Sequence, residues 1–282
     1  YCAKCGRENK TSDRYCARCG HRLPQSQSFA SLHQQQDLFP SEIQKILETT
    51  FGHAKFREYQ EEIIQHVIKG NDVLAVLATG YGKSICYQVP ALAIEGTAIV
   101  ISPLISLMKD QVDSLQLQGI SAAFINSTQN FAEQERVKHD VTVGRTDILY
   151  LAPERIVSND MSTFLAQQVI SLIAIDEAHC VSRWGPSFRE DYLALDALAD
   201  LFPDVPRIAL TATADAQTRS DVVEKLRLND AQVFVGGFDR PNLRYEVAIK
   251  QAERQQLMDF LSAAAGDAPG IVYCRTRART EK

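Results

Sequence analysis

Short apolar runs alternate with amphipathic stretches through the middle of this chain, from about residue 72 to residue 236. The runs are rich in β-branched residues and apolar throughout, as expected for strands buried on both faces. Between them, segments such as 104–117 and 216–228 show helical spacing. This alternation predicts an α/β fold, with a parallel sheet and helices on both faces. The runs are Val73–Leu77, Ala98–Ser102, Ala122–Ile125, Ile148–Leu151, Leu172–Ile175, Arg207–Leu210 and Gln232–Val235.

The first run leads into a glycine-containing turn, and a helical pattern follows from Ile85 to Ile94. A strand, a turn and a helix N-terminus in this order surround a phosphate with backbone N–H groups and the positive end of a helix dipole. Lys83 would reach the β and γ phosphates of a nucleotide, and the Ser84 hydroxyl would hold magnesium. An ordinary turn with a surface lysine is the alternative, and Leu77 stands where the full phosphate-loop pattern has glycine. The candidate cofactor-binding residues of the loop are Thr79, Gly80, Gly82, Lys83 and Ser84.

Two later strands also end in polar side chains. Asp176 and Glu177 follow one strand; Asp176 could hold magnesium through water while Glu177 polarises the water that attacks the γ phosphate. A solvated acidic turn is the alternative. His179 would couple this site to a neighbouring loop, and Thr211 and Thr213 stand where a sensor between hydrolysis and substrate would sit. The catalytic candidates are Lys83, Asp176 and Glu177.

These residues, in this order, resemble the superfamily 2 helicases and, within them, the RecQ family. Phe56–Gln60 resembles the adenine-reading segment of that family, in which the Gln60 amide would recognise the base edge and Arg57 would lie on its face. Ser102–Val112 and Tyr150–Arg155 resemble its next two motifs, the first of which helps carry DNA. The resemblance covers about residues 39–282.

The segment Cys180–Arg189 is similar to the aromatic-rich loop that couples DNA binding to hydrolysis in this family. Trp184 and Phe188 would offer flat faces to bases, and Arg183 and Arg189 would contact phosphates. A core position for Trp184, the only tryptophan, is the alternative. The sequence departs from the family pattern at Tyr81, usually glycine, at His53, usually tyrosine, at Pro186 and Ser187, usually His-Asp, and at Glu190, usually proline.

The first 22 residues carry two Cys-x-x-Cys-Gly knuckles separated by ten residues. This is the spacing of a structural zinc ribbon with four thiolate ligands, although a disulfide pair or an iron-sulfur site would use the same residues. Six basic and two acidic residues make the segment a candidate for docking DNA or a partner protein; a merely solvated charged face is about as good an interpretation. The candidate zinc ligands are Cys2, Cys5, Cys16 and Cys19.

We therefore expect a zinc ribbon at 1–23, a Gln/Ser-rich linker at 24–38, a first RecA-like ATP-binding domain at 39–237 and the start of a second at 238–282. Because the chain begins with Tyr1, it is expected to start inside a longer one. The net charge of −5 argues against coating nucleic acid by bulk attraction. No apolar run approaches the length of a membrane span, so no membrane is implied. We expect a cytoplasmic protein, nucleoid-associated if bacterial, that is a monomer.

The resemblance implies an enzyme that uses ATP and magnesium for 3′ to 5′ translocation on single-stranded DNA and for unwinding of forked or duplex DNA in repair and recombination. It also places the arginines that complete the transition state in later motifs of the second domain. The chain alone is thus expected to bind nucleotide but to hydrolyse it poorly. The alternatives are an RNA helicase, a translocase that does not unwind, and a DNA-binding adaptor with a degenerate motor.

Overall fold

The computed structural model describes most of the chain, and its described residues divide into two units, one before and one after residue 238. The expected zinc ribbon and linker lie outside the described residues, as do residues 183–186 and 188 of the expected DNA-coupling loop, which include the candidates Arg183, Trp184 and Phe188. The described residues are 39–156, 158–182, 187, 189–237, 243–263, 270–274 and 276.

A parallel sheet of seven strands forms the centre of the first unit, as the apolar runs predict. Its strand order is β3-β4-β2-β5-β6-β1-β7. All seven predicted runs become strands, with ends that differ by at most two residues. The strands are β1 Val73–Val76, β2 Thr97–Ile101, β3 Ala122–Ile125, β4 Ile148–Leu151, β5 Ile170–Ile175, β6 Arg207–Thr211 and β7 Gln232–Val235.

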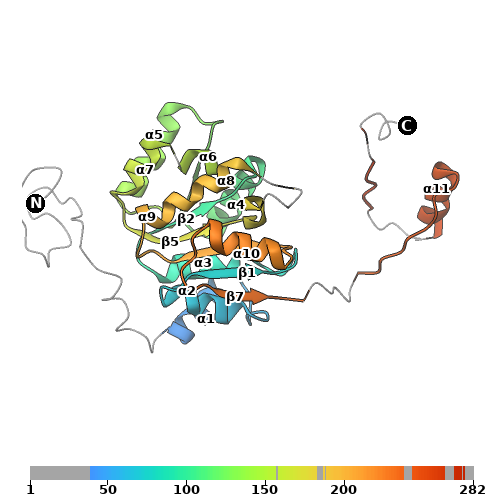
Figure 1. Ribbon diagram of the computed structural model, residues 1–282, viewed down its shortest axis with the longest axis horizontal. Coiled ribbons are helices and arrows are strands. Elements are labelled where there is room, and N and C mark those ends of the chain that lie inside the picture. The colour runs from blue at the N-terminus through green and yellow to red at the C-terminus, as the bar shows by residue number, and fades with distance from the viewer. Residues whose placement is uncertain are drawn as a thin grey trace, which may run out of the picture. The chain divides into compact units, whose positions relative to one another are not determined.

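Helices cover both faces of this sheet (Figure 1). Side chains of β1 show why, because successive residues of a strand point to opposite faces. Leu74 and Val76 enter one core, which α5, α6, α7 and α10 close, while Val73 and Ala75 enter another, which α2, α3 and α4 close. The main helices of the unit are α1 Phe39–Thr49, α2 Gln60–Ile68, α3 Ile85–Ala93, α4 Ile105–Leu117, α5 Phe131–Thr142, α6 Pro153–Ile156, α7 Asn159–Leu165 and α10 Ala216–Lys225.

Short helical segments complete the face that carries α10. They connect the end of β5 to the start of β6, and Tyr192, Leu195 and Leu198 bury their side chains in the core beneath. The helix α1 packs outside the sheet layers, where Ile43 and Leu47 meet residues of α2 and α3. The short segments are η2 Ala178–Val181, α8 Glu190–Leu193, η3 Ala194–Ala197 and α9 Leu198–Leu201.

The amino ends of β1 and β6 are joined by a buried ion pair between Asp72 and Arg207. The Arg207 guanidinium lies 2.6 Å from the Asp72 carboxylate, and both residues are at most 5% exposed. Backbone N–H groups of Arg207 and Asn229 also donate to this carboxylate, at 2.8 and 2.7 Å. Asp72 therefore satisfies three donors from two later segments of the chain, as a buried charge requires.

The second unit contains one helix, α11 Glu253–Ala263, among its described residues. The sequence pattern also favours extended runs at 243–248 and 271–274, but neither described segment forms a strand. A strand needs a partner to complete its ladder of hydrogen bonds, and in the described part of this unit none is present. The expected strands at 243–248 and 271–274 are therefore not found. The helix α11 likewise buries none of its residues.

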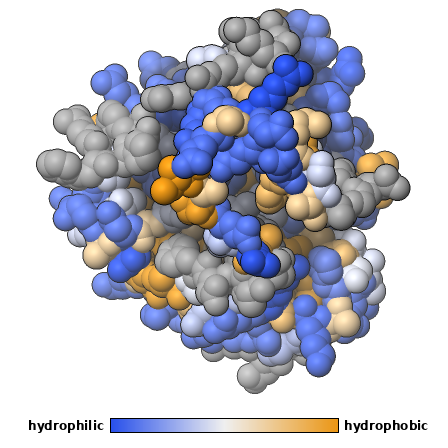
Figure 2. All heavy atoms as spheres, turned by 90° about the vertical axis from the view of Figure 1, so that its right-hand side faces the viewer, coloured by the Kyte–Doolittle hydropathy of each residue, from blue (hydrophilic) through white to orange (hydrophobic). Residues whose placement is uncertain are grey.

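Hydrophilic residues predominate on the face drawn in Figure 2, where hydrophobic residues form small separate patches. Such scattered apolar surface is usual for a folded domain in water. Across the described ranges, no helix has both the length and the apolar character that crossing a membrane would require.

Candidate nucleotide-binding site

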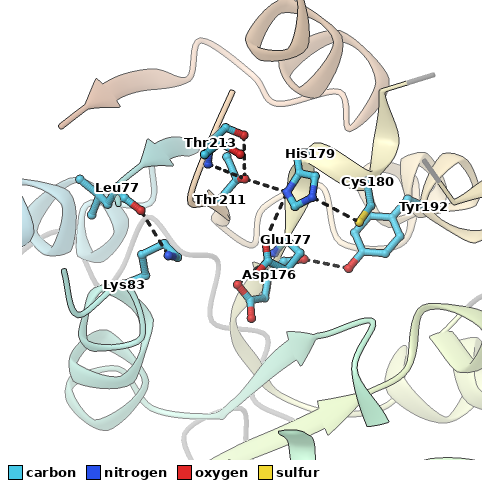
Figure 3. Close-up of polar contacts among 9 residues, drawn as sticks. All are labelled: Leu77, Lys83, Asp176, Glu177, His179, Cys180, Tyr192, Thr211 and Thr213. Carbon is cyan, nitrogen blue, oxygen red and sulfur yellow. Dashed lines mark hydrogen bonds and ion pairs between the residues drawn. The ribbon is translucent and has the colours of Figure 1, made fainter. Parts of the chain in front are cut away.

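The segment predicted to be a phosphate loop connects β1 to α3, as its sequence predicts. Gly80 and Gly82 both have a φ of +82°, a conformation that glycine adopts without strain. The Lys83 ammonium donates to the Leu77 carbonyl at 3.2 Å, inside the turn (Figure 3). Ser84 immediately precedes the first turn of α3, so the free N–H groups of this helix point toward the loop.

The segment before α2 is fastened to this loop. Gln60, which is only 3% exposed, donates from its side-chain amide to the carbonyls of Tyr81 at 3.1 Å and Gly82 at 3.0 Å. The Arg57 guanidinium donates to the Gly80 carbonyl. A side-chain carbon at Gly82 would lie 2.7 Å from the Gln60 nitrogen, so the close approach requires glycine here. The two residues predicted to read the base, Arg57 and Gln60, thus lie beside the predicted phosphate loop.

The acidic pair follows β5, which is two strands from β1 in the sheet. Burial and the nearby charge of Glu177 raise the pKa of Asp176 to about 6, although the Glu177 backbone N–H donates to its carboxylate at 2.9 Å and the charge of Lys83 acts in the opposite sense. Glu177 has a φ of +50°, which costs a residue with a side chain about 1–2 kcal/mol. Backbone strain of this kind is often found at functional sites.

His179 joins the acidic pair to β6. Its Nδ1 atom lies 3.2 Å from the Glu177 carboxylate and 2.9 Å from the Thr211 hydroxyl (Figure 3). The Thr211 hydroxyl donates its single proton to the Thr213 carbonyl at 3.2 Å. The same hydroxyl must therefore accept a hydrogen bond from His179, and this assigns a proton to the Nδ1 atom of His179. Hydrogen bonds to Cys180 and Glu177 raise the pKa of His179 to about 9, and the bond to His179 lowers that of Glu177. The Cys180 sulfur is 4.0 Å away, which makes Glu177 the nearer partner.

The three polar strand ends meet because β5, β6 and β1 are consecutive in the sheet. The Leu77 N–H donates to the Thr211 carbonyl at 3.0 Å, which ties the start of the phosphate loop to the end of β6. Lys83, Asp176, Glu177, His179, Thr211 and Thr213 are therefore gathered around one edge of the sheet, as Figure 3 shows.

Sequence reasoning missed Tyr192. This residue is fully buried, and its hydroxyl donates to the Asp176 carbonyl at 2.8 Å (Figure 3). It thereby fixes the backbone that carries both carboxylates. A single tyrosine in a short helix carries no motif, so only the folded arrangement reveals this role.

The described ends of the expected DNA-coupling loop are anchored to the first unit. Ser182 is fully buried and donates to Asp221 of α10 at 2.6 Å. The Arg189 guanidinium donates to the Pro103 carbonyl at 3.2 Å, at the start of the segment expected to carry DNA. Arg189 thus joins the end of one predicted DNA-contacting segment to the start of another.

Two carboxylates, a lysine and a row of helix N–H groups can together bind a triphosphate with its magnesium ion. Magnesium retains several waters and takes only one or two carboxylates beside the substrate phosphates. The half-buried carboxylate of Asp176 and the Ser84 hydroxyl fit that donor set. No group of three or more metal-ligating side chains is found within the described residues, and the four cysteines expected to bind zinc lie outside them.

Known proteins with related sequences are helicases. The profile of the DEAD/DEAH box helicase family matches residues 57–222. The ATP-dependent DNA helicase RecQ of Haemophilus influenzae is 46% identical over 84% of this chain and 38% of its own length. The mouse bifunctional 3′-5′ exonuclease/ATP-dependent helicase WRN is 42% identical over 84% of this chain and 17% of its own length. The chain thus spans well under half of the curated relatives it matches.

Solved structures show the same fold. The DUF1998 helicase MrfA has a TM-score of 0.64 at 20% identity, over 87% of this chain and 40% of MrfA. The DEAD-box helicase Mss116, solved with single-stranded RNA and UDP-BeF, has a TM-score of 0.55 at 16% identity, over 76% of this chain and 46% of its own. The expected RecA-like sheet is confirmed by these likenesses.

Proposed function

Because this chain belongs to the DEAD/DEAH box helicase family and, within it, to the RecQ family, we propose that it is the ATP-binding part of a DNA-unwinding motor. The observation that carries the proposal is the meeting of three strand ends: the phosphate loop after β1, the acidic pair after β5 and the threonines after β6. A site built only to hold a nucleotide would not need the last of these.

In the proposed mechanism, Gln60 and Arg57 hold the base, and Thr79, Gly80, Gly82 and Lys83 hold the phosphates. Ser84 and Asp176 would hold magnesium, which supplies charge to the phosphate oxygens when bound. Glu177 orients and polarises the attacking water; its pKa is held low by the hydrogen bond from His179, so it is ionised at neutral pH.

The coupling of hydrolysis to movement is proposed to run through His179. Loss of the γ phosphate would shift Glu177, and the contact of His179 with Thr211 would carry this shift to Thr213 and β6. The neighbouring loop, Cys180–Arg189, is proposed to contact single-stranded DNA through Arg183, Trp184, Phe188 and Arg189. As the resemblance to the RecQ family implies, the motor would move 3′ to 5′ on single-stranded DNA and act on forked or duplex DNA in repair and recombination. It is proposed to act as a monomer, in the cytoplasm or at the nucleoid.

The experiment that tests this proposal measures ATP binding by the chain and by Lys83→Ala, and DNA-stimulated ATP hydrolysis by a longer chain that contains a complete second RecA-like domain. We expect Lys83→Ala to abolish detectable ATP binding, because Lys83 supplies the ammonium group that pairs with the phosphates. Lys45→Ala, which removes an exposed lysine of α1, is the matched control and should bind ATP normally.

Normal ATP binding by Lys83→Ala would contradict the motor and favour a DNA-binding adaptor, an alternative raised by Tyr81 in the phosphate loop. Stimulation of hydrolysis by single-stranded RNA more than by DNA would instead favour an RNA helicase. DNA-stimulated hydrolysis by the longer chain without strand separation would indicate a translocase that does not unwind.

We also propose that Cys2, Cys5, Cys16 and Cys19 bind one structural zinc ion, on the basis of their spacing. The ribbon would dock DNA or a partner protein. Metal analysis of the purified chain should find zinc that is lost in Cys16→Ser; iron in its place would indicate an iron-sulfur site.

A further inference from the structure

Tyr81 lies between Gly80 and Gly82 of the phosphate loop. Its side chain contacts the segment predicted to read the base, residues 56–60, which is called the base-reading segment below. Its hydroxyl donates to the Glu58 carboxylate at 3.0 Å, and its own backbone carbonyl accepts from Gln60. Residues 57–60 and 80–82 are thus joined by four hydrogen bonds. Three of them use backbone carbonyls of the loop as acceptors, and only the bond of Tyr81 with Glu58 joins two side chains.

The hydrogen-bonding capacity of Gln60 limits what it can do once a nucleotide is bound. A primary amide has two N–H donors, and in this structure one points to the Tyr81 carbonyl and the other to the Gly82 carbonyl. The amide oxygen already accepts the Arg57 backbone N–H at 2.8 Å and has one lone pair left. If Gln60 donates to a ring nitrogen of the base, it must release one of the two loop carbonyls.

The bond between Tyr81 and Glu58 does not depend on Gln60, so it survives this exchange. We propose that Tyr81 is a positioning residue that keeps the phosphate loop attached to the base-reading segment while Gln60 turns from the loop to the base. Recognition of the base would then strengthen the hold on the phosphates. This inference rests on the proposed ATP site and adds to it a residue whose role glycine at the same position could not perform.

The test compares a ligand that has a base with one that lacks it. Binding of ATP and of inorganic tripolyphosphate, each with magnesium, is measured by calorimetry for the chain and for Tyr81→Phe. We expect Tyr81→Phe to weaken ATP binding by about threefold to tenfold, the effect of one lost hydrogen bond to a charged group near water. Tripolyphosphate binding should not change, because that ligand never engages Gln60.

Two further variants separate coupling from a general loss of loop structure. Glu58→Ala should match Tyr81→Phe, and the double variant should be no weaker than either single one, as expected for two partners of one bond. Glu58→Gln keeps an acceptor oxygen and should recover part of the affinity. Tyr245→Phe, the same chemical change at an exposed tyrosine of the second unit, is the control and should bind as the chain does.

Unchanged ATP binding by Tyr81→Phe would overturn the inference, and so would an equal loss of ATP and tripolyphosphate, since the hydroxyl would then support the loop alone. Additive losses in the double variant would also overturn it. A chain that binds neither ligand in any form would count against the proposed ATP site itself.

Discussion

The imidazole of His179 lies 2.9 Å from the hydroxyl of Thr211, a residue 32 positions further along the chain. This contact joins the end of β5 to the end of β6. Because the same nitrogen also faces the Glu177 carboxylate at 3.2 Å, one proton on His179 is shared between the acidic pair and the threonine. The protonation of this histidine should therefore be visible in the stability of the fold.

We predict that replacing His179 by alanine makes stability less dependent on pH. Folding raises the pKa of His179 from 6.5 to about 9, so the charged imidazole stabilises the folded chain fully below pH 6.5, and this contribution is lost as the pH rises through about 9. Allowing for partial solvent exposure, the difference in unfolding free energy between the chain and His179→Ala should shrink by about 1–2 kcal/mol from pH 6 to pH 9.5. Urea denaturation at several pH values, in the presence of a metal chelator, measures this difference in unfolding free energy. A difference that is constant with pH would contradict the prediction.

Replacement of Gly82 by alanine should weaken ATP binding as well as stability. The positive φ alone costs about 1–2 kcal/mol, but the new methyl group would also lie 2.7 Å from the Gln60 nitrogen and displace it. If Gln60 loses one hydrogen bond in this way, ATP binding should weaken by about threefold to tenfold.

Gly119→Ala is the matched control for this change. Gly119 has a φ of +81°, yet nothing lies within 4 Å of the added carbon. It should lose stability to a similar extent and bind ATP normally. If both alanine variants bound ATP equally well, the close approach of Gln60 would have no functional role.

Loss of the buried ion pair should be costly. Arg207→Ala leaves the Asp72 carboxylate buried with only backbone donors, and we expect a loss of about 3–5 kcal/mol in unfolding free energy. Arg227 pairs with Asp200 on the surface at 2.7 Å, and Arg227→Ala should leave the denaturation midpoint almost unchanged. A small and equal effect for both variants, measured by thermal denaturation, would contradict this reasoning.

Much of the fold can be predicted from the sequence because strands buried on both faces have a distinct pattern. The runs at Ala122–Ile125 and Ile148–Leu151 match β3 and β4 in full. Helix starts are less certain: the spacing of Ser41 and Gln44 suggests a capping box, but α1 begins at Phe39, two residues before Ser41. The capping box of α5, formed by Asn130 and Glu133, is identified only in the structure.

The site is predictable only in part, for a physical reason. Lys83, Asp176 and Thr211 can each be found at a strand end, since chemistry in a parallel sheet gathers there. The local sequence pattern does not determine the order of the strands, however. Nothing in the sequence therefore places β6 between β5 and β1, or brings the Tyr192 hydroxyl to the Asp176 carbonyl. The bond between Tyr81 and Glu58 likewise depends on a turn whose shape only the fold defines.

The order of strands also has a consequence for how the chain is made. The strand β1 emerges early, but its two neighbours in the sheet, β6 and β7, end at Thr211 and Val235. During synthesis, more than half of the chain must leave the ribosome before β1 is paired on both sides. Until then the apolar residues of β1 have no sheet to enter, and the newly made segment depends on chaperones or on rapid collapse to avoid aggregation.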